Sequence, residues 1–544
     1  MSSAKSQTEC KPGVEGPSPD HPLLRNKRQT TKGVKCVPGP FYRHPDLQSK
    51  DRLDCSRYYL CIGGAVVYEY KCTTGLQFDI IKQNCNFISL VKNCNVQELV
   101  TTPRPLLVTS EPICPEQELA CGDRTCIHRD LFCDGQVDCP DESDEGYCDI
   151  ANDPNAAKKC DLSKCKLPNC YCSKDGTKIP KNMDVKTVPQ IIVLTFDDAV
   201  NFQNWNLYKE IFDANRTNPN GCPIRGTFFL SHEYTNYQYT QKLWNKGHEI
   251  AVHSITHRTP ELWWSGNATL EDWFDEFAGQ ANIINKFGNI RMEDLRGIRV
   301  PFLRVGWNKQ FLMMKDFGFI YDSTMVAPFQ NPPLWPYTLD YRMPHKCVGA
   351  SNNCPSQAFP GIWELPMNQL ELEKDGVSCA MVDSCNIPGE ETYDFFMNNF
   401  FRHYETNRAP LGLYFHTTWF QNYDNMEGFL QFLDEMAERD DVWFITNYQL
   451  IQWMKNPTPL SKIERFAEWG CNDKRYKGEE KACETPNVCI LSNKETFGEH
   501  YFHTCATCPA YYPWIRNEFG LEDPSKFQEQ YEEELDPAVQ KKKK

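Results

Sequence analysis

The sequence has no long apolar run. None of its 544 residues falls in an uninterrupted apolar stretch of the roughly 18 residues that a membrane-spanning helix needs, so we expect no membrane span. Residues 1–35 are polar and lack the apolar centre of a signal peptide, so no such peptide is visible in this chain. Residues 25–28, Arg-Asn-Lys-Arg, are either a dibasic processing site or a solvated basic stretch. We therefore treat 1–35 as a polar N-terminal segment that processing could remove.

The chain also has few basic residues relative to acidic ones. It carries 58 Lys and Arg against 73 Asp and Glu, a formal net charge of −15, and no Lys/Arg stripe interrupts this acidity except the terminal run 541–544. Nucleic acid, a polyanion, is therefore disfavoured as a partner. A neutral polymer or a metal cation fits this charge better.

Cysteine is abundant, in contrast. There are 27 cysteines, crowded into 36–172 and 471–508 with only five between. This density indicates an oxidising compartment and hence a secreted protein of the extracellular matrix. The sequons at Asn215 and Asn267 predict N-glycosylation and agree with that location. We expect a monomer, although nothing in the sequence fixes the oligomeric state.

The first cysteine framework covers residues 36–96. It holds six cysteines, at 36, 55, 61, 72, 85 and 94, and a segment of this size needs such staples to fold. With its interleaved aromatic residues it resembles the peritrophin-A-type chitin-binding modules. The resemblance implies chitin as a partner, held by sugar stacking on rings. Tyr59, Tyr68 and Phe78 are the candidate rings, with core packing as the alternative for each.

A linker at 97–113 leads to a second six-cysteine unit at 114–149. Its densely acidic end, residues 133–145, calls for a cation, and oxygen ligands suit calcium. The unit resembles the low-density-lipoprotein-receptor class A modules. That resemblance implies a structural Ca²⁺ site and leaves open an extracellular protein partner. The implied ligands are the side chains of Asp134, Asp138, Asp144 and Glu145 and the backbone carbonyls of Leu131 and Gln136.

The longest region, 160–460, alternates strand-like and helix-like stretches. Apolar runs occur at 191–196, 225–230, 248–252, 296–300, 318–321, 362–365, 411–416 and 442–446, with amphipathic stretches between them. This alternation predicts an α/β fold, a distorted (β/α) barrel preceded by the two small disulfide-rich modules. A cysteine-containing extension at 461–516 should fold back on the barrel through disulfides. Residues 517–544 should form a disordered tail.

Three short motifs supply the chemistry of this region. Asp197 and Asp198 end the apolar run 191–196, His253 and His257 stand four residues apart, and His416 ends the run 411–416. One carboxylate and two imidazoles suffice for a catalytic zinc, or another divalent transition metal, with an open position. A second carboxylate and a third histidine remain for proton transfer. The motifs should meet where parallel strands end, which is where barrel enzymes place their sites.

The ordered motifs resemble those of the polysaccharide deacetylases of carbohydrate esterase family 4. With the two modules in front, the whole chain resembles the arthropod chitin deacetylases. The resemblance implies that Asp198, His253 and His257 hold the metal, that Asp197 is the general base and that His416 is the general acid. It further implies the roles of three other residues. Arg299 would orient Asp197, the backbone N–H of Phe302 would bind the oxyanion, and Glu364 would steady His416.

The predicted function is therefore the metal-dependent hydrolysis of the N-acetamido group of chitin. Acetate and glucosamine units would be the products, and the reaction would remodel a chitinous matrix. One alternative is a chitin-binding, matrix-organising protein with little deacetylase activity. Another is deacetylation of a different polymer such as peptidoglycan, which the chitin-binding-like module disfavours.

Overall fold

The computed structural model describes most of the chain in two units. It describes strands at 42–43, 57–62, 65–71, 76–79 and 84–87, and then residues 114–521 apart from 116, 147, 349–353, 373–375, 472–479, 494 and 497. The first unit is Met1–Leu131 with Val137–Tyr147, and the second is Phe132–Gln136 with Cys148–Lys544. Each is described separately below.

The first unit consists of short antiparallel sheets. Its strands are β1 (Tyr42–Arg43), β2 (Arg57–Ile62), β3 (Ala65–Lys71), β4 (Leu76–Asp79), β5 (Asn84–Phe87), β6 (Glu118–Ala120) and β7 (Cys126–His128). They pair as β1-β2-β3, β4-β5 and β6-β7. Disulfides Cys114–Cys126 and Cys121–Cys139 staple its later part. Tyr59, Tyr68 and Phe78 lie on β2, β3 and β4, but their side chains are outside the described residues.

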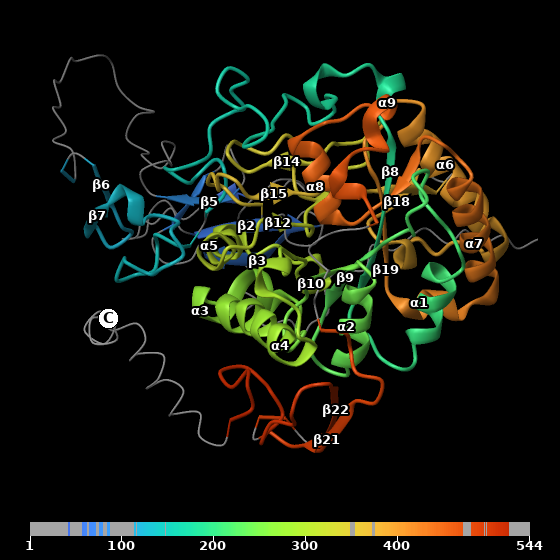
Figure 1. Cartoon of the computed structure of the whole chain (residues 1–544). Coiled ribbons are helices and arrows are strands. Elements are labelled where there is room, and N and C mark those ends of the chain that lie inside the picture. The colour runs from blue at the N-terminus through green and yellow to red at the C-terminus, as the bar shows by residue number, and fades with distance from the viewer. Residues whose placement is uncertain are drawn as a thin grey trace, which may run out of the picture. The chain divides into compact units, whose positions relative to one another are not determined.

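The second unit is built on one curled sheet (Figure 1). Its strand order is β14-β15-β12-β11-β10-β9-β8-β19, with β20 also paired to β8. The strands are β8 (Gln190–Asp197), β9 (Thr227–Leu230), β10 (Glu249–Val252), β11 (Gly297–Ile298), β12 (Tyr321–Asp322), β14 (Tyr337–Thr338), β15 (Trp363–Glu364), β19 (Leu411–Phe415) and β20 (Val442–Phe444). All pairings are parallel except β14 with β15. Within the described strands, β14 and β19 are the two ends of the ladder, so the predicted barrel is an incomplete one.

Helices cover this sheet on its outside, as Figure 1 shows. They are α1 (Trp205–Phe212), α2 (Tyr237–Asn245), α3 (Leu270–Trp273), α4 (Gly279–Gly288), α5 (Trp307–Phe317), α6 (Thr392–Tyr404), α7 (Tyr423–Ala437), α8 (Asn447–Lys455) and α9 (Leu460–Ile463). Every residue of β8 is buried, as expected of a parallel strand covered on both faces. In the described part of the chain, no helix combines the length and the apolar character that crossing a membrane requires.

Short additional strands complete the second unit. They are β13 (Val326–Ala327), which pairs with β16 (Met367–Asn368), and the hairpins β17 (Leu370–Leu372) with β18 (Val377–Cys379) and β21 (Asn487–Leu491) with β22 (His500–Thr504). The β21–β22 hairpin lies in the C-terminal extension and is stapled by Cys483–Cys505 and Cys489–Cys508.

The strand register brings the predicted motifs to one edge of the sheet. Phe415 is level with Phe196 across β19 and β8, and Ile298 is level with Val252 across β11 and β10. Because these strands are parallel, the residues that follow them emerge at the same, carboxyl-terminal edge. The expectation that the motifs meet at strand ends is therefore confirmed for the backbone.

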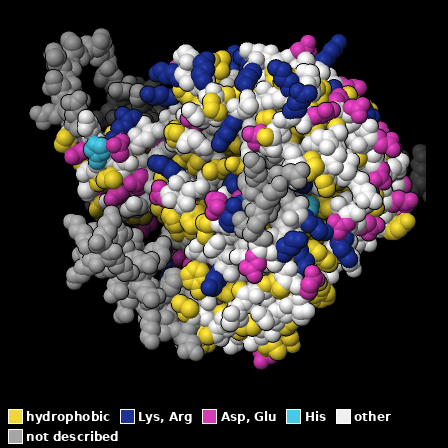
Figure 2. Space-filling model, in the orientation of Figure 1, with side chains coloured by type: hydrophobic (Ala, Val, Ile, Leu, Met, Phe, Trp, Pro, Cys, Tyr) yellow, Lys and Arg dark blue, Asp and Glu magenta, His cyan; other side chains and the backbone are white. Residues whose placement is uncertain are grey.

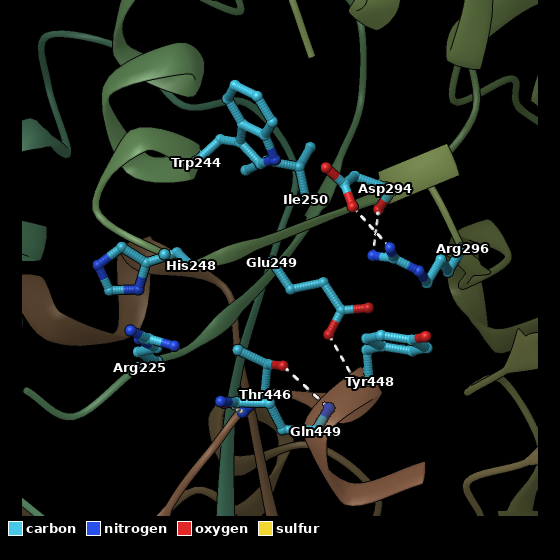
Figure 3. A pocket seen from close by; sticks show the side chains of 11 residues that line it. Arg225, Trp244, His248, Glu249, Ile250, Asp294, Arg296, Thr446, Tyr448 and Gln449 are labelled. Atoms are coloured by element: carbon cyan, nitrogen blue, oxygen red, sulfur yellow. Dashed lines mark hydrogen bonds and ion pairs between the residues drawn. The ribbon is translucent and has the colours of Figure 1, made fainter. Parts of the chain in front are cut away.

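The opposite edge of the sheet is filled by a polar network (Figure 3). Glu249, at the start of β10, accepts hydrogen bonds from the hydroxyl of Tyr321 at 2.8 Å and from the backbone N–H of Tyr448 at 2.8 Å. Arg296 donates to Asp294 at 2.6 Å. The cavity among these residues has a volume of only about 10 Å³, no more than one water molecule needs. This network stabilises the fold and leaves no room for a ligand.

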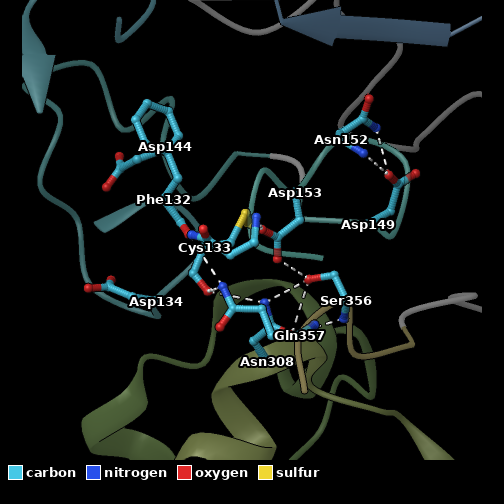
Figure 4. Close-up of a disulfide and its surroundings, with 12 residues drawn as sticks. Phe132, Cys133, Asp134, Asp144, Asp149, Asn152, Asp153, Asn308, Ser356 and Gln357 are labelled. Atoms are coloured by element: carbon cyan, nitrogen blue, oxygen red, sulfur yellow. Dashed lines mark hydrogen bonds between the residues drawn. A yellow bond between two sulfur atoms is a disulfide. The ribbon is translucent and has the colours of Figure 1, made fainter. Parts of the chain in front are cut away.

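Disulfides join distant parts of the second unit. Cys222–Cys471 ties the C-terminal extension to the barrel, as predicted, and Cys347–Cys354 and Cys379–Cys385 close short loops. The Cys133–Cys148 disulfide lies in a polar cluster (Figure 4). There the backbone carbonyl of Cys133 accepts hydrogen bonds from Asn308 at 3.1 Å and Gln357 at 3.0 Å. The segment Phe132–Gln136 is thereby fixed to α5 and its neighbouring loop.

Candidate active site

Three predicted metal ligands come together at the carboxyl-terminal edge of the sheet. Asp198 follows β8, while His253 and His257 follow β10. One ligand atom from each of the three lies within 4.8 Å of the others. The Asp198 Oδ1 atom is 3.8 Å from His253 Nε2 and 3.5 Å from His257 Nε2. These separations are long for hydrogen bonds, but they are close to the ~3.3 Å between ligands of a tetrahedral zinc ion.

His253 has the protonation that a metal ligand needs. Its Nδ1 lies 2.7 Å from the backbone carbonyl of Arg299. A carbonyl can only accept, so Nδ1 carries the hydrogen and Nε2 is left with a lone pair. Burial, reinforced by the nearby His257, lowers the pKa of His253 to about 3, so the ring is neutral. The donor set therefore fits a divalent metal ion.

Asp197 is held by a buried arginine. Arg299, which follows β11, donates from Nη1 to Asp197 Oδ1 at 2.7 Å, and both side chains are almost fully buried. Nη1 also donates to the hydroxyl of Thr195 at 2.8 Å, and the rest of the guanidinium donates to Ser323, from Nε to its carbonyl at 2.7 Å and from Nη2 to its hydroxyl at 3.0 Å. Arg299 is thus fixed in place against Asp197, the contact that its predicted orienting role requires.

The partner of His416 is Asp383, which the sequence analysis missed. His416 Nδ1 lies 2.9 Å from Asp383 Oδ2, and His416 Nε2 lies 3.9 Å from Asp198 Oδ2. Burial disfavours the charged ring, but the Asp383 hydrogen bond and the charges of Asp197, Asp383 and Asp198 outweigh it and raise the pKa of His416 to about 9. The ring is therefore held as an acid, with Nε2 toward the metal ligands.

Glu364, predicted to steady His416, lies elsewhere. It ends β15 level with Asp322 of β12, where both side chains are fully buried. Burial and the neighbouring charge of Asp322 raise the pKa of Glu364 well above its usual value. Burial likewise raises the pKa of Asp322 to about 6. The role assigned to Glu364 is therefore wrong: Glu364 lies beside Asp322 in the buried sheet, and Asp383 holds His416.

Phe302 lies beside the metal ligands. Its ring packs against that of His257 with 4.6 Å between centroids, and 40% of the residue is exposed. Its backbone adopts a φ of +57°, which is uncommon for a bulky residue and occurs where surrounding structure imposes it. The position suits a residue that borders the substrate, and the oxyanion role of its N–H stays a prediction.

The remaining predicted sites stay predictions. Asn215 and Asn267 are both exposed, as glycosylation requires. The six calcium ligands that the resemblance implies also stay a prediction. A second cluster with metal-ligating residue types, Cys121 with Cys139 and Asp141, is explained by the disulfide between its cysteines. Figure 2 shows basic and acidic side chains interspersed over the visible face, in line with the predicted lack of a basic stripe.

Comparisons with known sequences match both small modules. The model of the chitin binding Peritrophin-A domain matches residues 45–94. The model of the low-density lipoprotein receptor domain class A matches residues 112–148.

Two silkworm proteins are similar over most of the chain. Chitin deacetylase 1 of Bombyx mori is 49% identical over 461 residues, which is 83% of this chain and 85% of that protein. Chitin deacetylase 8 of Bombyx mori is 36% identical over 378 residues, or 67% of this chain and 94% of that protein. Among solved structures, a polysaccharide deacetylase from Mycobacterium smegmatis is 17% identical with a TM-score of 0.33, covering 54% of this chain and 96% of its own.

Proposed function

Because the chain belongs to the chitin deacetylase family, we propose that it hydrolyses the N-acetamido groups of chitin to acetate and glucosamine units. The strongest support is that two hydrogen-bonded side chains, Asp197 and His416, lie with the three candidate metal ligands at one edge of the sheet. Asp197 is paired with Arg299, and His416 is paired with Asp383. A base and an acid beside a metal site are what amide hydrolysis requires.

Asp198, His253 and His257 would hold the metal ion, and zinc suits this carboxylate and imidazole set. When bound, such an ion polarises the acetamide carbonyl and acidifies the attacking water. The neutral state of His253 and its fixed Nδ1–H prepare the ligand without further rearrangement.

Asp197 acts as the general base in this proposal. Arg299 occupies Oδ1, so the proton of the attacking water passes to Oδ2. The arginine places its positive charge against the carboxylate in a site that is almost closed to solvent. The backbone N–H of Phe302 would stabilise the oxyanion that forms on the substrate carbonyl.

His416 acts as the general acid. Asp383 binds its Nδ1–H, so Nε2 is the atom that carries the proton toward the leaving nitrogen. An amide nitrogen leaves poorly as an anion, and protonation from Nε2 converts it to an amine. The raised pKa means that this proton is present at neutral pH.

The modules support chitin as the ligand. A chitin-binding domain on the same chain would keep the catalytic unit near an insoluble polymer and raise its effective concentration there. The class A module would bind Ca²⁺ as a structural ion and could bind an extracellular protein. The disulfides Cys222–Cys471 and Cys483–Cys505, with the others described, fit secretion into a chitinous matrix.

Acetate release from chitin oligomers, alongside binding to insoluble chitin, tests this function. The zinc-loaded protein should release acetate, and removal of the metal by a chelator should abolish release while chitin binding by the full chain persists. If the zinc-loaded protein binds chitin but releases no acetate, the chain is instead a matrix-organising binding protein.

A further inference from the structure

The carboxylate that holds His416 has no second support. Asp383 Oδ2 lies 2.9 Å from His416 Nδ1, and Asp383 Oδ1 accepts a hydrogen bond from the backbone N–H of His416 at 3.4 Å. Within the described residues, no other group donates to this carboxylate. The other paired carboxylate, Asp197, differs because the guanidinium of Arg299 that holds it is itself fixed by further hydrogen bonds. The orientation of Asp383 must therefore come from the placement of its backbone.

The segment that carries Asp383 is a single short turn. It is the 3₁₀-helix Val382–Cys385, whose Ser384 donates from its backbone N–H and its hydroxyl to the carbonyl of Met381, at 3.0 and 2.7 Å. A 3₁₀ turn of this length has poor hydrogen-bond geometry and little stability of its own. Burial of Val382 fixes one side of the turn in the core. Its position along the chain depends on what its ends are joined to.

A disulfide closes the chain around this turn. Cys379 ends β18 and Cys385 ends the 3₁₀-helix, and the bond between them joins residues six positions apart. Both cysteines are buried, and Asp383 stands inside the closed ring, two residues before Cys385. A ring this small leaves its backbone few conformations. The disulfide therefore restricts where the Asp383 backbone can lie.

The other end of the disulfide is anchored in the fold. Cys379 is level with Leu370 in the β17–β18 hairpin. Asn399, buried on α6, accepts a hydrogen bond from the backbone N–H of Glu371 on β17 at 2.9 Å and donates to its carbonyl at 3.1 Å. A continuous set of contacts thus runs from α6 through β17 and β18 to the disulfide, and from there to Asp383.

We propose that the Cys379–Cys385 disulfide is a positioning element for the catalytic acid, because it holds the Asp383 backbone where its carboxylate meets His416. The inference rests on the proposed function for the role of His416. Without the disulfide the turn opens, Asp383 leaves His416 for part of the time, and the ring loses its orientation, while the metal ligands keep theirs. Full activity then requires the oxidising compartment that the cysteine content indicates.

The kinetic test removes the disulfide with and without its target. Cys379→Ala combined with Cys385→Ala should lower kcat for the chitin hexamer by roughly 10-fold in the zinc-loaded full chain, and should leave KM within about 2-fold. In an Asp383→Asn background the same pair should change kcat by less than about 2-fold, because the interaction that it supports is already lost.

Two further variants control this comparison. Cys347→Ala with Cys354→Ala opens a loop closed by a disulfide of similar span, seven positions, and should keep the wild-type kcat. Asn399→Ala leaves both cysteines in place and loosens the hairpin instead. It should lower kcat several-fold, again only where Asp383 is present, and it gives the same comparison if the cysteine pair does not fold.

Proton NMR gives a readout that does not depend on activity. The Nδ1–H proton of His416, bound by a carboxylate, should give a far-downfield resonance that is assigned by its loss in His416→Gln. The resonance should weaken or vanish in Asp383→Asn and in the Cys379 and Cys385 pair, and should remain in the Cys347 and Cys354 pair.

These measurements separate the inference from the proposed function. A wild-type resonance in the Cys379 and Cys385 pair, or an equal loss of kcat with and without Asp383, would overturn the positioning role and leave the function intact. The same losses in the Cys347 and Cys354 pair would also overturn it. Absence of the resonance in the wild type would overturn the contact on which the inference depends. A wild-type resonance that the Cys379 and Cys385 pair loses, without acetate release by the zinc-loaded wild type, would overturn the function and leave the positioning of His416.

Discussion

Replacing Asp383 with asparagine removes the charge that holds His416 and keeps the size of the side chain. In the wild type the pKa of His416 is raised to about 9, against 6.5 for an ordinary imidazole. His416 must be protonated to act as the acid. Activity should therefore persist at pH values below this pKa and fall as the pH rises through it. Asp197 and Asp198 still face His416 in the variant, so its pKa should settle between these two values, roughly one pH unit or more below the wild type.

The assay is the pH dependence of kcat/KM for a chitin oligomer, measured at equal zinc content. The alkaline limb should move to lower pH in Asp383→Asn, and the maximal rate should fall on the order of 100-fold because the ring loses its orientation. Glu364→Gln is the matched control, since Glu364 lies beside Asp322 and should leave the limb in place. An unmoved limb in Asp383→Asn, or an equal movement in Glu364→Gln, would refute the assignment of Asp383.

Three further predictions concern the metal, the buried ion pair and the disulfide that joins the C-terminal extension to the barrel. His257→Ala should weaken zinc binding by at least about 100-fold, measured by competition with a chelator, because loss of a direct ligand should exceed the loss of a supporting group. Arg299→Met leaves Asp197 buried without its partner and should lower the free energy of unfolding by about 3–5 kcal/mol in a urea titration. Cys222→Ser with Cys471→Ser should lower it by about 2–4 kcal/mol, and an unchanged urea midpoint would contradict the tying role of that disulfide.

The strand-end motifs could be found from sequence because each follows a strongly apolar run. The runs 191–196 and 411–416 correspond to β8 and β19, which have eight and five residues. The runs 296–300 and 362–365 were expected as strands of similar length, yet β11 and β15 have two paired residues each. Apolar patterning reports burial, and buried residues such as Val300 continue past the point where the paired ladder ends.

Asp383 escaped detection because no strand leads to it. It lies in a 3₁₀-helix, Val382–Cys385, 33 residues before His416. The available signal was an acidic residue between Cys379 and Cys385, two cysteines close enough to form a disulfide. The family resemblance implied that role for Glu364 instead, but the apolar run 362–365 places Glu364 in the buried core beside Asp322.

The structure of the C-terminal extension could be predicted only in part. That the extension returns to the barrel through a disulfide followed from cysteine counting, and Cys222–Cys471 confirms it. The hairpin β21–β22 has an alternating pattern that puts Tyr501 outward and Phe502 inward. Its position beside α2 depends on contacts between residues more than 200 positions apart, such as Gln238 with Cys483, which no local pattern encodes.

Acetate release by Asp197→Asn tests the central claim most directly. The substitution removes the carboxylate that accepts the proton from water and leaves Asp198, His253 and His257 to hold the metal. With zinc content matched to the wild type, acetate release from the chitin hexamer should fall on the order of 10²- to 10⁴-fold while hexamer binding is kept. Release at the wild-type rate by the zinc-loaded variant would contradict the proposed site.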